Sequence, residues 1–436
     1  MLSYLPLPLS RFARSENGGG TAWGLLLMAT VLMTGGYAID VQNVTMERTH
    51  LQTVADSAAH AALLTREHNS ESVAIDAALS VAEANMPPGT FGAVLNESDV
   101  EFGTWDHASL TFTPDPGERD AVRVRLARSE GRANAIRTYL FQMVGIDQWN
   151  LEATSTFVTY RPTCFREGFV GTGPVDIQSN NIFQNGFCVH SNDYVSLNSN
   201  NYFEPGTVVS MPDVDDLDIP NSGFQTNLGL DAALRSGSYN IRIVSRIDDI
   251  INTIAVPGSE YYKDYITNSS PLTVTKKTIT AADLPAGRII YWNCSGGKGT
   301  IYKDTLVDSV VIKTACEVSF GSGVRVENSV IVNSNTSARS FNSPSGFQLG
   351  KNDNCAPGGG SQLVTMGGMN FAANLQIYGS QLLAIGDIEF AAQADGIQGA
   401  AMVSGGTVSG TSNMSMAFCG TGMENNFEAE YFRMVD

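Results

Sequence analysis

The sequence predicts a mixed fold: an N-terminal transmembrane helix that continues into an α+β module, and then a mainly-β, right-handed parallel β-helix. Three observations carry this prediction. Residues 21–39 are apolar and uncharged, residues 98–160 alternate between strand-like and helix-like patterns, and short motifs after residue 160 recur at an offset of 20 residues. We expect an anchor and helix over 1–66, an α+β module over 67–160 and the β-helix over 161–436.

The composition excludes one class of partner. The 436 residues include 26 Lys and Arg against 44 Asp and Glu, which gives a net charge of −18. Because phosphate binding needs clustered Lys and Arg, this balance argues against nucleic acid as a partner. A content of 43 Gly suits the many tight turns of an all-β repeat better than a helical bundle.

The first predicted element is a membrane helix over Thr21–Ile39, which is long enough to cross a bilayer core of about 30 Å. Arg11 and Arg14 precede it, so the positive-inside rule places the N-terminus in the cytoplasm and the bulk of the chain outside. The residues expected to anchor the helix are Thr21, Trp23, Leu25, Leu26, Leu27, Val31, Leu32 and Ile39.

This segment has two interpretations. Gly36 and Ala38 resemble a small-x-small cleavage site, which is typical of a signal peptide. Small and apolar residues, however, continue at helical spacing from Val41 to about Arg66. Since a signal peptide is normally cut before a folded domain and not in the middle of a helix, the pattern favours a retained anchor.

A family resemblance rests on a set of residues in and around this helix. The set is Arg11, Arg14, Glu16, Asn17, Gly18, Asp40, Leu51, Gln52, Ala55, Asp56, Ala58, Ala59, Ala61 and Ala62. In this order they resemble the N-terminal module of Tad/Flp pilus-assembly proteins of the TadG type. The resemblance implies a single-pass protein of the bacterial inner membrane with a periplasmic bulk, and other Tad pilus-assembly proteins and minor pilins as partners. Glu16 precedes the glycine run, so prepilin-peptidase processing is not implied.

The polar residues of this motif also have two interpretations. Gln52 and Asp56 lie either on the solvated face of an Ala-rich helix or beside a helix-packing surface, since Ala at three- and four-residue spacing lets helices approach closely.

The middle module is expected to contain four strands and one helix. The strands are Val100–Trp105, Leu110–Thr113, Ala121–Leu126 and Asn150–Tyr160, and the helix is Ala133–Val144. With the preceding long helix, this order resembles the pilin-like module of TadE/TadG proteins.

Three pairs of segments support the repeat: Val175–Gly186 with Val195–Gly206, Asp308–Ile312 with Asn328–Val332, and Ile377–Leu383 with Ile397–Val403. A 20-residue period of short apolar runs predicts a parallel β-helix, with Asn–Asn stretches forming amide ladders at a corner. An antiparallel sandwich is the alternative. We expect residues 213–290 to leave one turn as an insertion, with helices at Leu228–Leu234 and Ile247–Ile254. The segments Ala281–Cys294 and Phe418–Phe427 resemble β-helix domains appended to TadG-related proteins.

The six cysteines all follow residue 160: Cys164, Cys188, Cys294, Cys316, Cys355 and Cys419. An even number without a C-x-x-C pair fits disulfides in an oxidising compartment. Spacings close to one repeat favour the pairs Cys164–Cys188 and Cys294–Cys316, which leaves Cys355–Cys419.

The search for chemistry predicts a non-enzymatic protein without cofactor or metal. Polysaccharide cleavage needs paired acids or a base, and the one dense acidic cluster, Asp213 to Asp218, lies in the insertion. His190 has no obvious acidic partner nearby in sequence. Tyr261, Tyr262 and Tyr265 suggest a contact surface for a protein or a glycan. A β-helix that binds or cleaves envelope polysaccharide remains the alternative.

Overall fold

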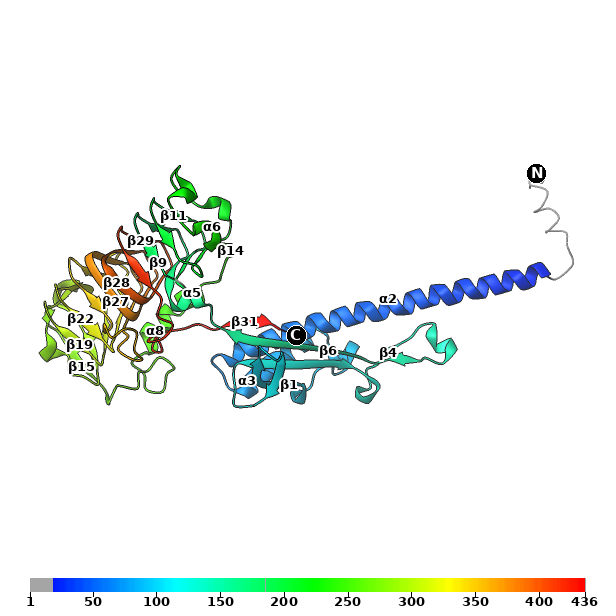
Figure 1. Ribbon diagram of the computed structural model, residues 1–436. Helices are drawn as coiled ribbons and strands as arrows, with labels where there is room; N and C mark the ends of the chain where they lie inside the picture. Colours follow the sequence, from blue (N-terminus) through cyan, green and yellow to red (C-terminus); the bar gives the residue numbers. More distant parts are fainter. Residues whose placement is uncertain (1–18, 185, 436) are drawn as a thin grey trace. The chain divides into compact units, whose positions relative to one another are not determined.

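The computed structural model describes residues 19–184 and 186–435. The chain forms two compact units: the first contains the chain up to Tyr160 and again from Glu430, and the second contains Arg161–Ala429 (Figure 1). An apolar N-terminal helix followed by a mostly-β region is confirmed. The motif residues Arg11, Arg14, Glu16, Asn17 and Gly18 lie outside the described residues.

The first unit begins with one long helix. Helix α2 runs without interruption over Gly19–Arg66, through the small-residue stretch at Gly36–Ala38, and ends at the predicted residue. A four-residue break separates it from α3, Glu71–Asn85, which packs back on α2. The short helices that follow are α4 (Pro88–Phe91), η1 (Glu97–Asp99), η2 (Glu130–Arg132) and η3 (Phe141–Val144).

An antiparallel sheet completes the first unit, in the order β2-β1-β3-β6-β31. Its strands are β1 (Val100–Asp106), β2 (Thr111–Pro114), β3 (Ala121–Arg128), β6 (Leu151–Tyr160) and β31 (Tyr431–Met434). The core lies between the sheet and the Ala-rich face of α2, where Ala55, Ala58, Ala59 and Ala62 are fully buried.

The C-terminal boundary differs from the expected one. Residues 161–436 do not all belong to the repeat unit, because β31 pairs with β6, with Tyr431 opposite Tyr160 and Met434 opposite Phe157. The second unit is therefore inserted between two neighbouring strands of the first sheet. The sequence of residues 431–434 suits a strand, but it does not indicate whether that strand joins the antiparallel sheet of the first unit or the parallel sheet of the second.

The predicted helix Ala133–Val144 is wrong. Ala133 has φ 56°, and β4 (Ile136–Arg137) pairs antiparallel with β5 (Gln148–Trp149). Only the single turn η3 is helical. The apolar residues at helical spacing belong to a hairpin, which we name the arm (residues 136–149).

The second unit contains a 24-stranded parallel sheet arranged as three ladders. The first ladder, in stacking order, contains β15 (Asn268–Val274), β17 (Arg288–Trp292), β20 (Val310–Thr314), β23 (Val330–Asn333), β26 (Gln362–Thr365), the C-terminal parts of β27 (Met369–Ala384) and β28 (Ile388–Ser404), then β7 (Gly168–Gly171), β10 (Cys188–Ser191), β13 (Val208–Met211) and β14 (Leu234–Ser236).

The other two ladders are built from the strands between these. The second contains β16 (Thr278–Ile279), β18 (Lys298–Ile301), β21 (Glu317–Phe320), β24 (Phe341–Ser343), the first parts of β27 and β28, β29 (Val408–Gly410), β8 (Val175–Ile177) and β11 (Val195–Leu197). The third contains β19 (Leu306–Asp308), β22 (Arg325–Glu327), β25 (Gln348–Leu349), the middle of β27 and β28, β30 (Ser415–Ala417), β9 (Ile182–Phe183) and β12 (Tyr202–Phe203).

The short helices of this unit lie between and beside these strands. They are α5 (Thr163–Arg166), η4 (Val214–Asp216), η5 (Gly223–Gln225), α6 (Leu230–Ala233), α7 (Arg242–Ser245), α8 (Ile247–Thr253), η6 (Ala281–Asp283) and η7 (Ser295–Gly297).

Two of the three repeat alignments have the predicted register. Val175 lies opposite Val195, and Ile377 lies opposite Ile397, both at an offset of 20. The third is shifted by one residue, because Val311 and not Val310 lies opposite Val330. The left-handed corner residues Ser309 (φ 53°) and Asn328 (φ 47°) occupy equivalent positions and set this shorter coil.

The chain enters the stack in its middle. Strand β28, near the end of the sequence, pairs with β7, the first strand. The first coils continue outward from β7 to β14, and residues 268–417 build the other part of the stack back to β28.

The predicted insertion at 213–290 is therefore shorter than expected. Residues 234–236 and 268–292 carry strands of the stack, and 237–267 make the connection between its two parts. Helix α8 packs Ile247, Ile250 and Ile251 against strand residues from several coils, including Val170 and Ile289. The helical spacing of these isoleucines was the correct signal for α8.

Candidate functional site

The part of the first unit around the apolar stretch of α2 brings together the features that need a functional explanation. Among the described residues, α2 is the one helix long and apolar enough to cross a membrane. The predicted anchor residues are all exposed on it: Thr21, Trp23, Leu25, Leu26, Leu27, Val31, Leu32 and Ile39. Large exposed apolar side chains are what a lipid-embedded helix presents.

Asp40 marks the end of this apolar stretch and binds the arm. Its Oδ1 accepts a hydrogen bond from the Tyr139 N–H at 2.7 Å, and its Oδ2 accepts from the N–H groups of Leu140 and Phe141 at 2.9 and 2.8 Å. Burial opposes ionisation of the carboxyl, but the three backbone donors outweigh burial and lower the pKa of Asp40. The carboxylate therefore accepts from three backbone N–H groups that, in a helix over Ala133–Val144, would donate to the carbonyls four residues before them.

Gly36 lets the arm lie directly against α2. A Cβ at this position would lie 2.8 Å from the Cβ of Leu140, closer than real atoms approach, whereas a Cβ at Gly35 would meet nothing. On the same side, the rings of Tyr37 and Phe141 meet edge to face at 5.5 Å, and Phe141 packs on Trp149 at 5.4 Å.

The tip of the arm, residues 138–146, is uncharged and mostly apolar. Met143 is 82% exposed and Val144 62% exposed. A cavity of about 670 Å³ lies between the tip and the helix, with walls from Leu32, Met33 and Tyr37 on one side and Leu140, Phe141, Met143 and Val144 on the other.

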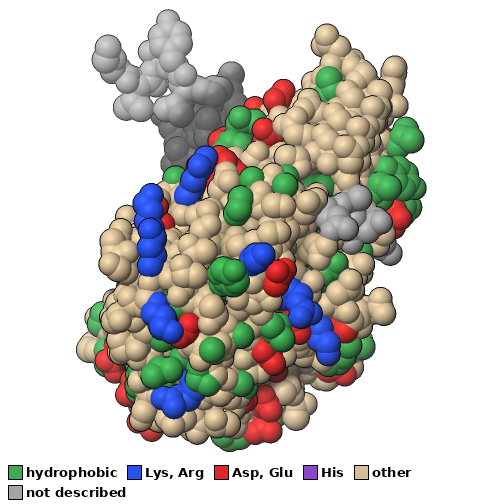
Figure 2. All heavy atoms as spheres, turned by 90° about the vertical axis from the view of Figure 1, so that its left-hand side faces the viewer, with side chains coloured by type: hydrophobic (Ala, Val, Ile, Leu, Met, Phe, Trp, Pro, Cys, Tyr) green, Lys and Arg blue, Asp and Glu red, His purple; other side chains and the backbone are tan. Residues whose placement is uncertain are grey.

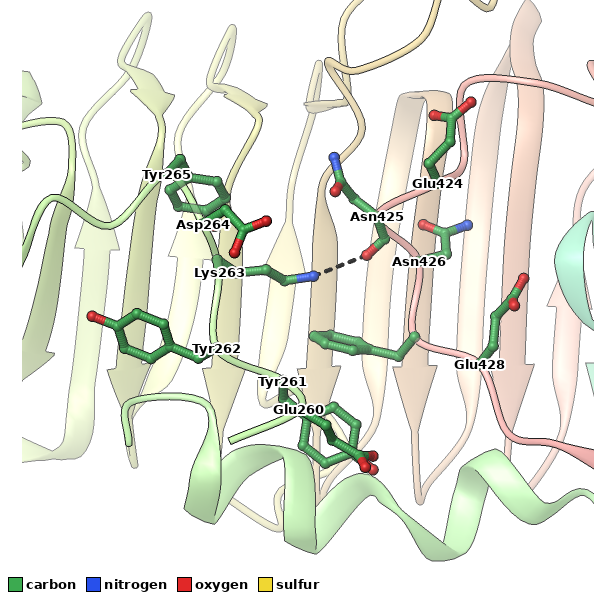
Figure 3. A pocket seen from close by; sticks show the side chains of 11 residues that line it. Glu260, Tyr261, Tyr262, Lys263, Asp264, Tyr265, Glu424, Asn425, Asn426 and Glu428 are labelled. Atoms are coloured by element: carbon green, nitrogen blue, oxygen red, sulfur yellow. Dashed lines mark hydrogen bonds between the residues drawn. The ribbon is translucent and has the colours of Figure 1, made fainter. Parts of the chain in front are cut away.

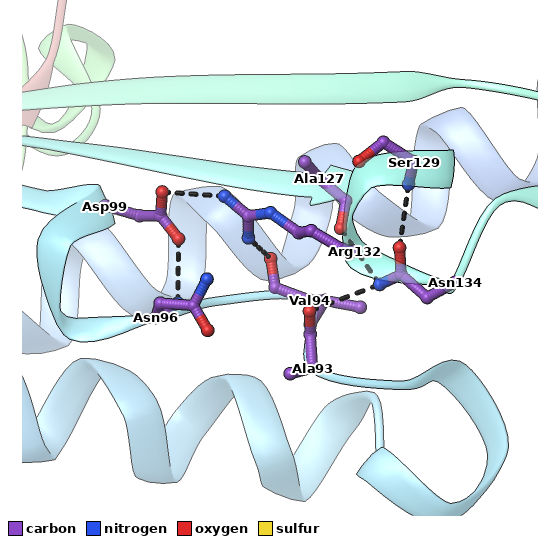
Figure 4. Close-up of polar contacts among 8 residues, drawn as sticks. All are labelled: Ala93, Val94, Asn96, Asp99, Ala127, Ser129, Arg132 and Asn134. Atoms are coloured by element: carbon purple, nitrogen blue, oxygen red, sulfur yellow. Dashed lines mark hydrogen bonds and ion pairs between the residues drawn. The ribbon is translucent and has the colours of Figure 1, made fainter.

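A polar network fixes the root of the arm (Figure 4). Arg132 pairs with Asp99 at 2.7 Å and donates to the Val94 carbonyl at 2.9 Å. The side chain of Asn134 accepts from the Ser129 N–H and donates to the carbonyls of Ala93 and Ala127. Close by, Arg128 pairs with Glu47 of α2 at 2.6 Å. The arm is thus held both at its root and near its tip.

The part of α2 that follows Asp40 and contains the motif residues Leu51, Gln52, Ala55, Asp56, Ala58 and Ala59 packs in the core. Leu51, Ala55, Ala58 and Ala59 are fully buried in the core of the first unit. The amide of Gln52 donates to the Thr154 carbonyl of β6 at 3.0 Å and to Asp56 at 2.9 Å. Gln52 therefore joins the helix to the sheet, and Asp56 orients it.

In the second unit, His190 and the acidic cluster Asp213–Asp218, which the sequence singles out, lie within hydrogen bonds and turns of the fold. His190 is buried; its Nδ1 lies 2.8 Å from Ser210 Oγ and its Nε2 lies 3.0 Å from Asn192 Oδ1. Burial lowers the pKa of His190. The four aspartates are exposed: Asp213 caps η4, Asp218 accepts from Ser196, and Asp215 and Asp216 lie in the first turn of η4.

The three tyrosines do not form the exposed surface expected from the sequence. Tyr261 is buried and meets Phe427 edge to face at 5.7 Å, while Tyr262 and Tyr265 are half-buried in the same apolar cluster. They pack here because the connection 237–267 covers the outer face of the first ladder, where aromatic side chains fill the space under it.

A polar hollow of about 320 Å³ opens beside these tyrosines, between the segments 260–265 and 424–428 (Figure 3). Lys263 reaches across it and donates to the Asn425 carbonyl at 2.9 Å, with its ammonium 4.3 Å from the centre of the Phe427 ring. Burial lowers the pKa of Lys263 to about 8, and Asp264 partly opposes this shift. Glu428 at the rim pairs with Arg161 and Arg166.

No group of three His, Cys, Asp or Glu residues that would hold a metal ion occurs among residues 19–184 and 186–435. On the face of the second unit seen in Figure 2, hydrophobic, basic and acidic side chains are interspersed over a surface made mostly of backbone and other side chains.

Comparison with known families divides the chain at the same place as the structure. Residues 18–80 match the family described as Flp pilus-assembly TadE/G-like, and residues 57–156 match a Tad-like Flp pilus-assembly family. The resemblance predicted from the N-terminal motif is confirmed. Residues 168–420, more than half of the chain, match a domain of unknown function, DUF7867. The chain belongs to the DUF7867 family. No curated protein and no solved structure matches it.

The DUF7867 match contains all three ladders between β7 and β30, and the disulfides lie in or at the edge of this region. The pairs are Cys164–Cys188, Cys294–Cys316 and Cys355–Cys419, as the spacing favours. Beside the last pair, the buried carboxylate of Glu167 accepts from the N–H groups of Cys419 and Gly420 at 2.6 and 2.5 Å. These contacts tie the end of the DUF7867 region to its beginning.

The arm is a site that the sequence pattern did not predict. The spacing of Tyr139, Leu140 and Met143 predicts a helix, because helical spacing alone does not distinguish a packed helix from an apolar hairpin tip. A signal was present: residues 138–146 contain no charge and end in the Gly145–Ile146 turn.

Proposed function

We propose that this chain is a non-enzymatic, membrane-anchored component that assembles or anchors a Tad/Flp pilus, with its bulk in the periplasm. One observation carries the proposal. The Tad-type matches cover 18–156 continuously, which is the stretch that forms the apolar helix and the α+β unit packed on it. Other Tad pilus-assembly proteins and minor pilins are the partners that this assignment implies.

The orientation in the membrane follows from charge. Arg11 and Arg14 precede the apolar stretch, and the positive-inside rule places them in the cytoplasm. The unbroken helix through Gly36–Ala38 favours a retained anchor. Mass spectrometry of the membrane fraction tests this: we expect peptides from Thr21–Ile39 in the mature protein, and a mature N-terminus at Ile39 would contradict it.

We further infer that the three ladders wind as a right-handed parallel β-helix that acts as a spacer or binding module. Registers at offsets of 19 and 20 residues and the order of strands within each coil support this winding. Right-handed crossover is the general rule for parallel strands in one sheet.

The absence of enzymatic activity is proposed from the way the polar groups are used. Cleavage of a sugar chain needs an acid and a base free to reach one bond. His190 is buried with both ring nitrogens hydrogen-bonded, and Glu428 is engaged by two arginines. The exposed Asp213–Asp218 cluster forms its own cap and turn.

Deletion and complementation in the native bacterium test the pilus role. We expect deletion to reduce the number of Tad pili seen by electron microscopy, and expression of the full chain to restore it. A chain with Asp213, Asp215, Asp216 and Asp218 changed to Asn should restore pili equally well. Normal piliation in the deletion strain would reject the proposal.

A polysaccharide-directed role is the competing hypothesis, and a chemical assay separates the two. Purified full-length chain is incubated with envelope polysaccharide, and the release of unsaturated or reducing sugar ends is measured. We expect none. Release of such ends that disappears in the four-Asp variant would favour the polysaccharide enzyme.

A further inference from the structure

The arm presents an apolar tip beside a helix that crosses the membrane. Figure 1 shows the arm, marked by β4, extending along α2 in the first unit. Contacts join them at three points: the Asp40 carboxylate on the amides of residues 139–141, Leu140 over Gly36, and Phe141 against Tyr37. The position of the tip relative to the helix is therefore fixed.

The tip lies alongside the apolar part of α2. The cavity beneath it is lined by Ala29, Leu32 and Met33, which precede Asp40 by seven or more residues. At 1.5 Å per residue, these side chains lie about 10 Å or more from Asp40 along the helix axis. If Asp40 lies at the level of the lipid headgroups, Met143 and Val144 reach the depth at which acyl chains begin.

The side chains of the arm follow the order expected at a membrane interface. The exposed apolar residues Met143 and Val144 lie at the turn, and the exposed aromatic residue Tyr139 lies between them and Arg137 along the chain. The charged residues Arg137 and Asp147 flank the uncharged tip. Tyr and Trp favour the headgroup region, and charged side chains remain in water.

We propose that residues 138–146 insert into the leaflet that faces the α+β unit, beside the anchor helix. The occupant of the apolar surface is lipid, because the surface is continuous with the lipid-exposed side of α2. Two membrane contacts, one spanning and one interfacial, restrict rotation and tilt of the first unit on the membrane.

The test places a fluorophore at the tip of the full chain, reconstituted in vesicles of phosphatidylethanolamine and phosphatidylglycerol. Met143→Cys is labelled with the polarity-sensitive dye NBD; the six native cysteines are in disulfides and do not react. Leu110→Cys is the matched control, since Leu110 is 70% exposed in the turn between β1 and β2. Lipids that carry a doxyl quencher on the acyl chain report contact.

We expect blue-shifted emission at position 143, and a loss of fluorescence to the doxyl lipids that is about twofold or more above the loss at position 110. Equal quenching at the two positions, with equal access of aqueous iodide, would overturn the proposal. Protection from iodide without doxyl quenching, together with cross-linking to a second copy, would overturn it in favour of a protein partner.

A second test changes one of two adjacent glycines in α2 and none of the residues of the tip. In the labelled background, Gly36→Val collides with Leu140 and should displace the arm, so doxyl quenching falls toward the level at position 110. Gly35→Val adds the same side chain where nothing lies within 4 Å and should leave quenching unchanged. Unchanged quenching in Gly36→Val would contradict the docked geometry on which the proposal depends.

Discussion

At the scale of single residues, one carboxylate determines the conformation of a distant segment. Asp40 accepts hydrogen bonds from the amides of residues 139–141, at the start of the turn η3, so these amides do not bond to the carbonyls of residues 135–137 as a helix over Ala133–Val144 would require. Asp40 is part of the family motif, but its partner amides lie about a hundred residues away in sequence, and no local pattern identifies them.

We predict that Asp40→Asn loosens the arm. The amide keeps one acceptor oxygen but turns an N–H₂ group toward backbone donors, so hydrogen exchange of the amides of residues 139–141 should speed up by about tenfold. Asp106→Asn is the control, because Asp106 caps only its own turn at Ala108 and Ser109. Equal acceleration of residues 139–141 in both variants would contradict the assigned role.

The same contact predicts a dependence on pH. The pKa of Asp40 is lowered from 3.8 in the folded protein, so its contribution is fully present above about pH 4 and is lost as the pH falls through the folded value. Protection factors of residues 139–141, corrected for the intrinsic exchange rate, should be constant from pH 7 to 5 and fall at the lowest pH. In Asp40→Asn this fall should be absent.

His190 gives a second prediction at the residue scale, with the opposite type of group. Burial lowers the pKa of His190 from 6.5, so as the pH falls below 6.5 the unfolded chain binds a proton at His190 more readily than the folded chain. The second unit therefore loses stability as the pH falls. The slope has an upper limit of about 1.4 kcal/mol per pH unit. Hydrogen exchange of β10 in the full chain at pH 7.5 and 5.5 measures it.

The His190→Gln variant is the control for this prediction. His190 is the one histidine between Arg161 and Ala429, so the variant should lose most of the pH dependence of the second unit in this range. A slope that persists in His190→Gln would assign the effect to another group.

At the scale of elements, stacked asparagines fix the corners of the coils. Asn180 and Asn200 have left-handed φ angles of 62° and 64°, and the following Asn181 and Asn201 are buried. The Asn201 side chain accepts from the Asn181 N–H, and Asn227 accepts from the Asn201 N–H. The amide ladder expected from the Asn–Asn repeats is present, with side chain bonded to backbone from coil to coil.

We predict that Asn201→Ala destabilises the second unit by about 2 kcal/mol, because it leaves the buried Asn181 N–H without an acceptor. Asn198→Ala removes an exposed amide three residues away and should cost much less. Urea unfolding of the full chain, followed by hydrogen exchange at β9 and β12, measures the difference. Equal losses in the two variants would contradict the ladder as the source of stability.

The elements also show which parts of the fold sequence reasoning reaches. Strict alternation predicts β3, helical spacing predicts α2 and α8, and the offset of 20 predicts Val175 opposite Val195. These signals are local or periodic. The arm, the one-residue shift at Val311 and the destination of 431–434 depend on contacts between distant segments, for which a single sequence contains no periodic signal.

At the scale of the whole molecule, the first sheet is completed by residues that follow the second unit. Deletion of residues 430–436 should leave the edge of β6 unpaired, since β31 supplies its outer neighbour. We predict that the shortened chain aggregates more readily and loses stability in the first unit only. Hydrogen exchange that accelerates in β6 but not in β10 would agree, and unchanged exchange in β6 would disagree.

Entry of the chain into the middle of the stack has a consequence in time. Strands β7 to β9 acquire their second neighbours only when β28 to β30 have been synthesised, and the corner contact between Asn181 and Met414 spans 233 residues. At translation speeds of about 5–20 residues per second, the first coils wait roughly 10–50 s with an open edge. During this time, strands β7 to β9 of each new molecule can pair with strands of another molecule. The rate of synthesis of the second half of the chain sets how long this period lasts.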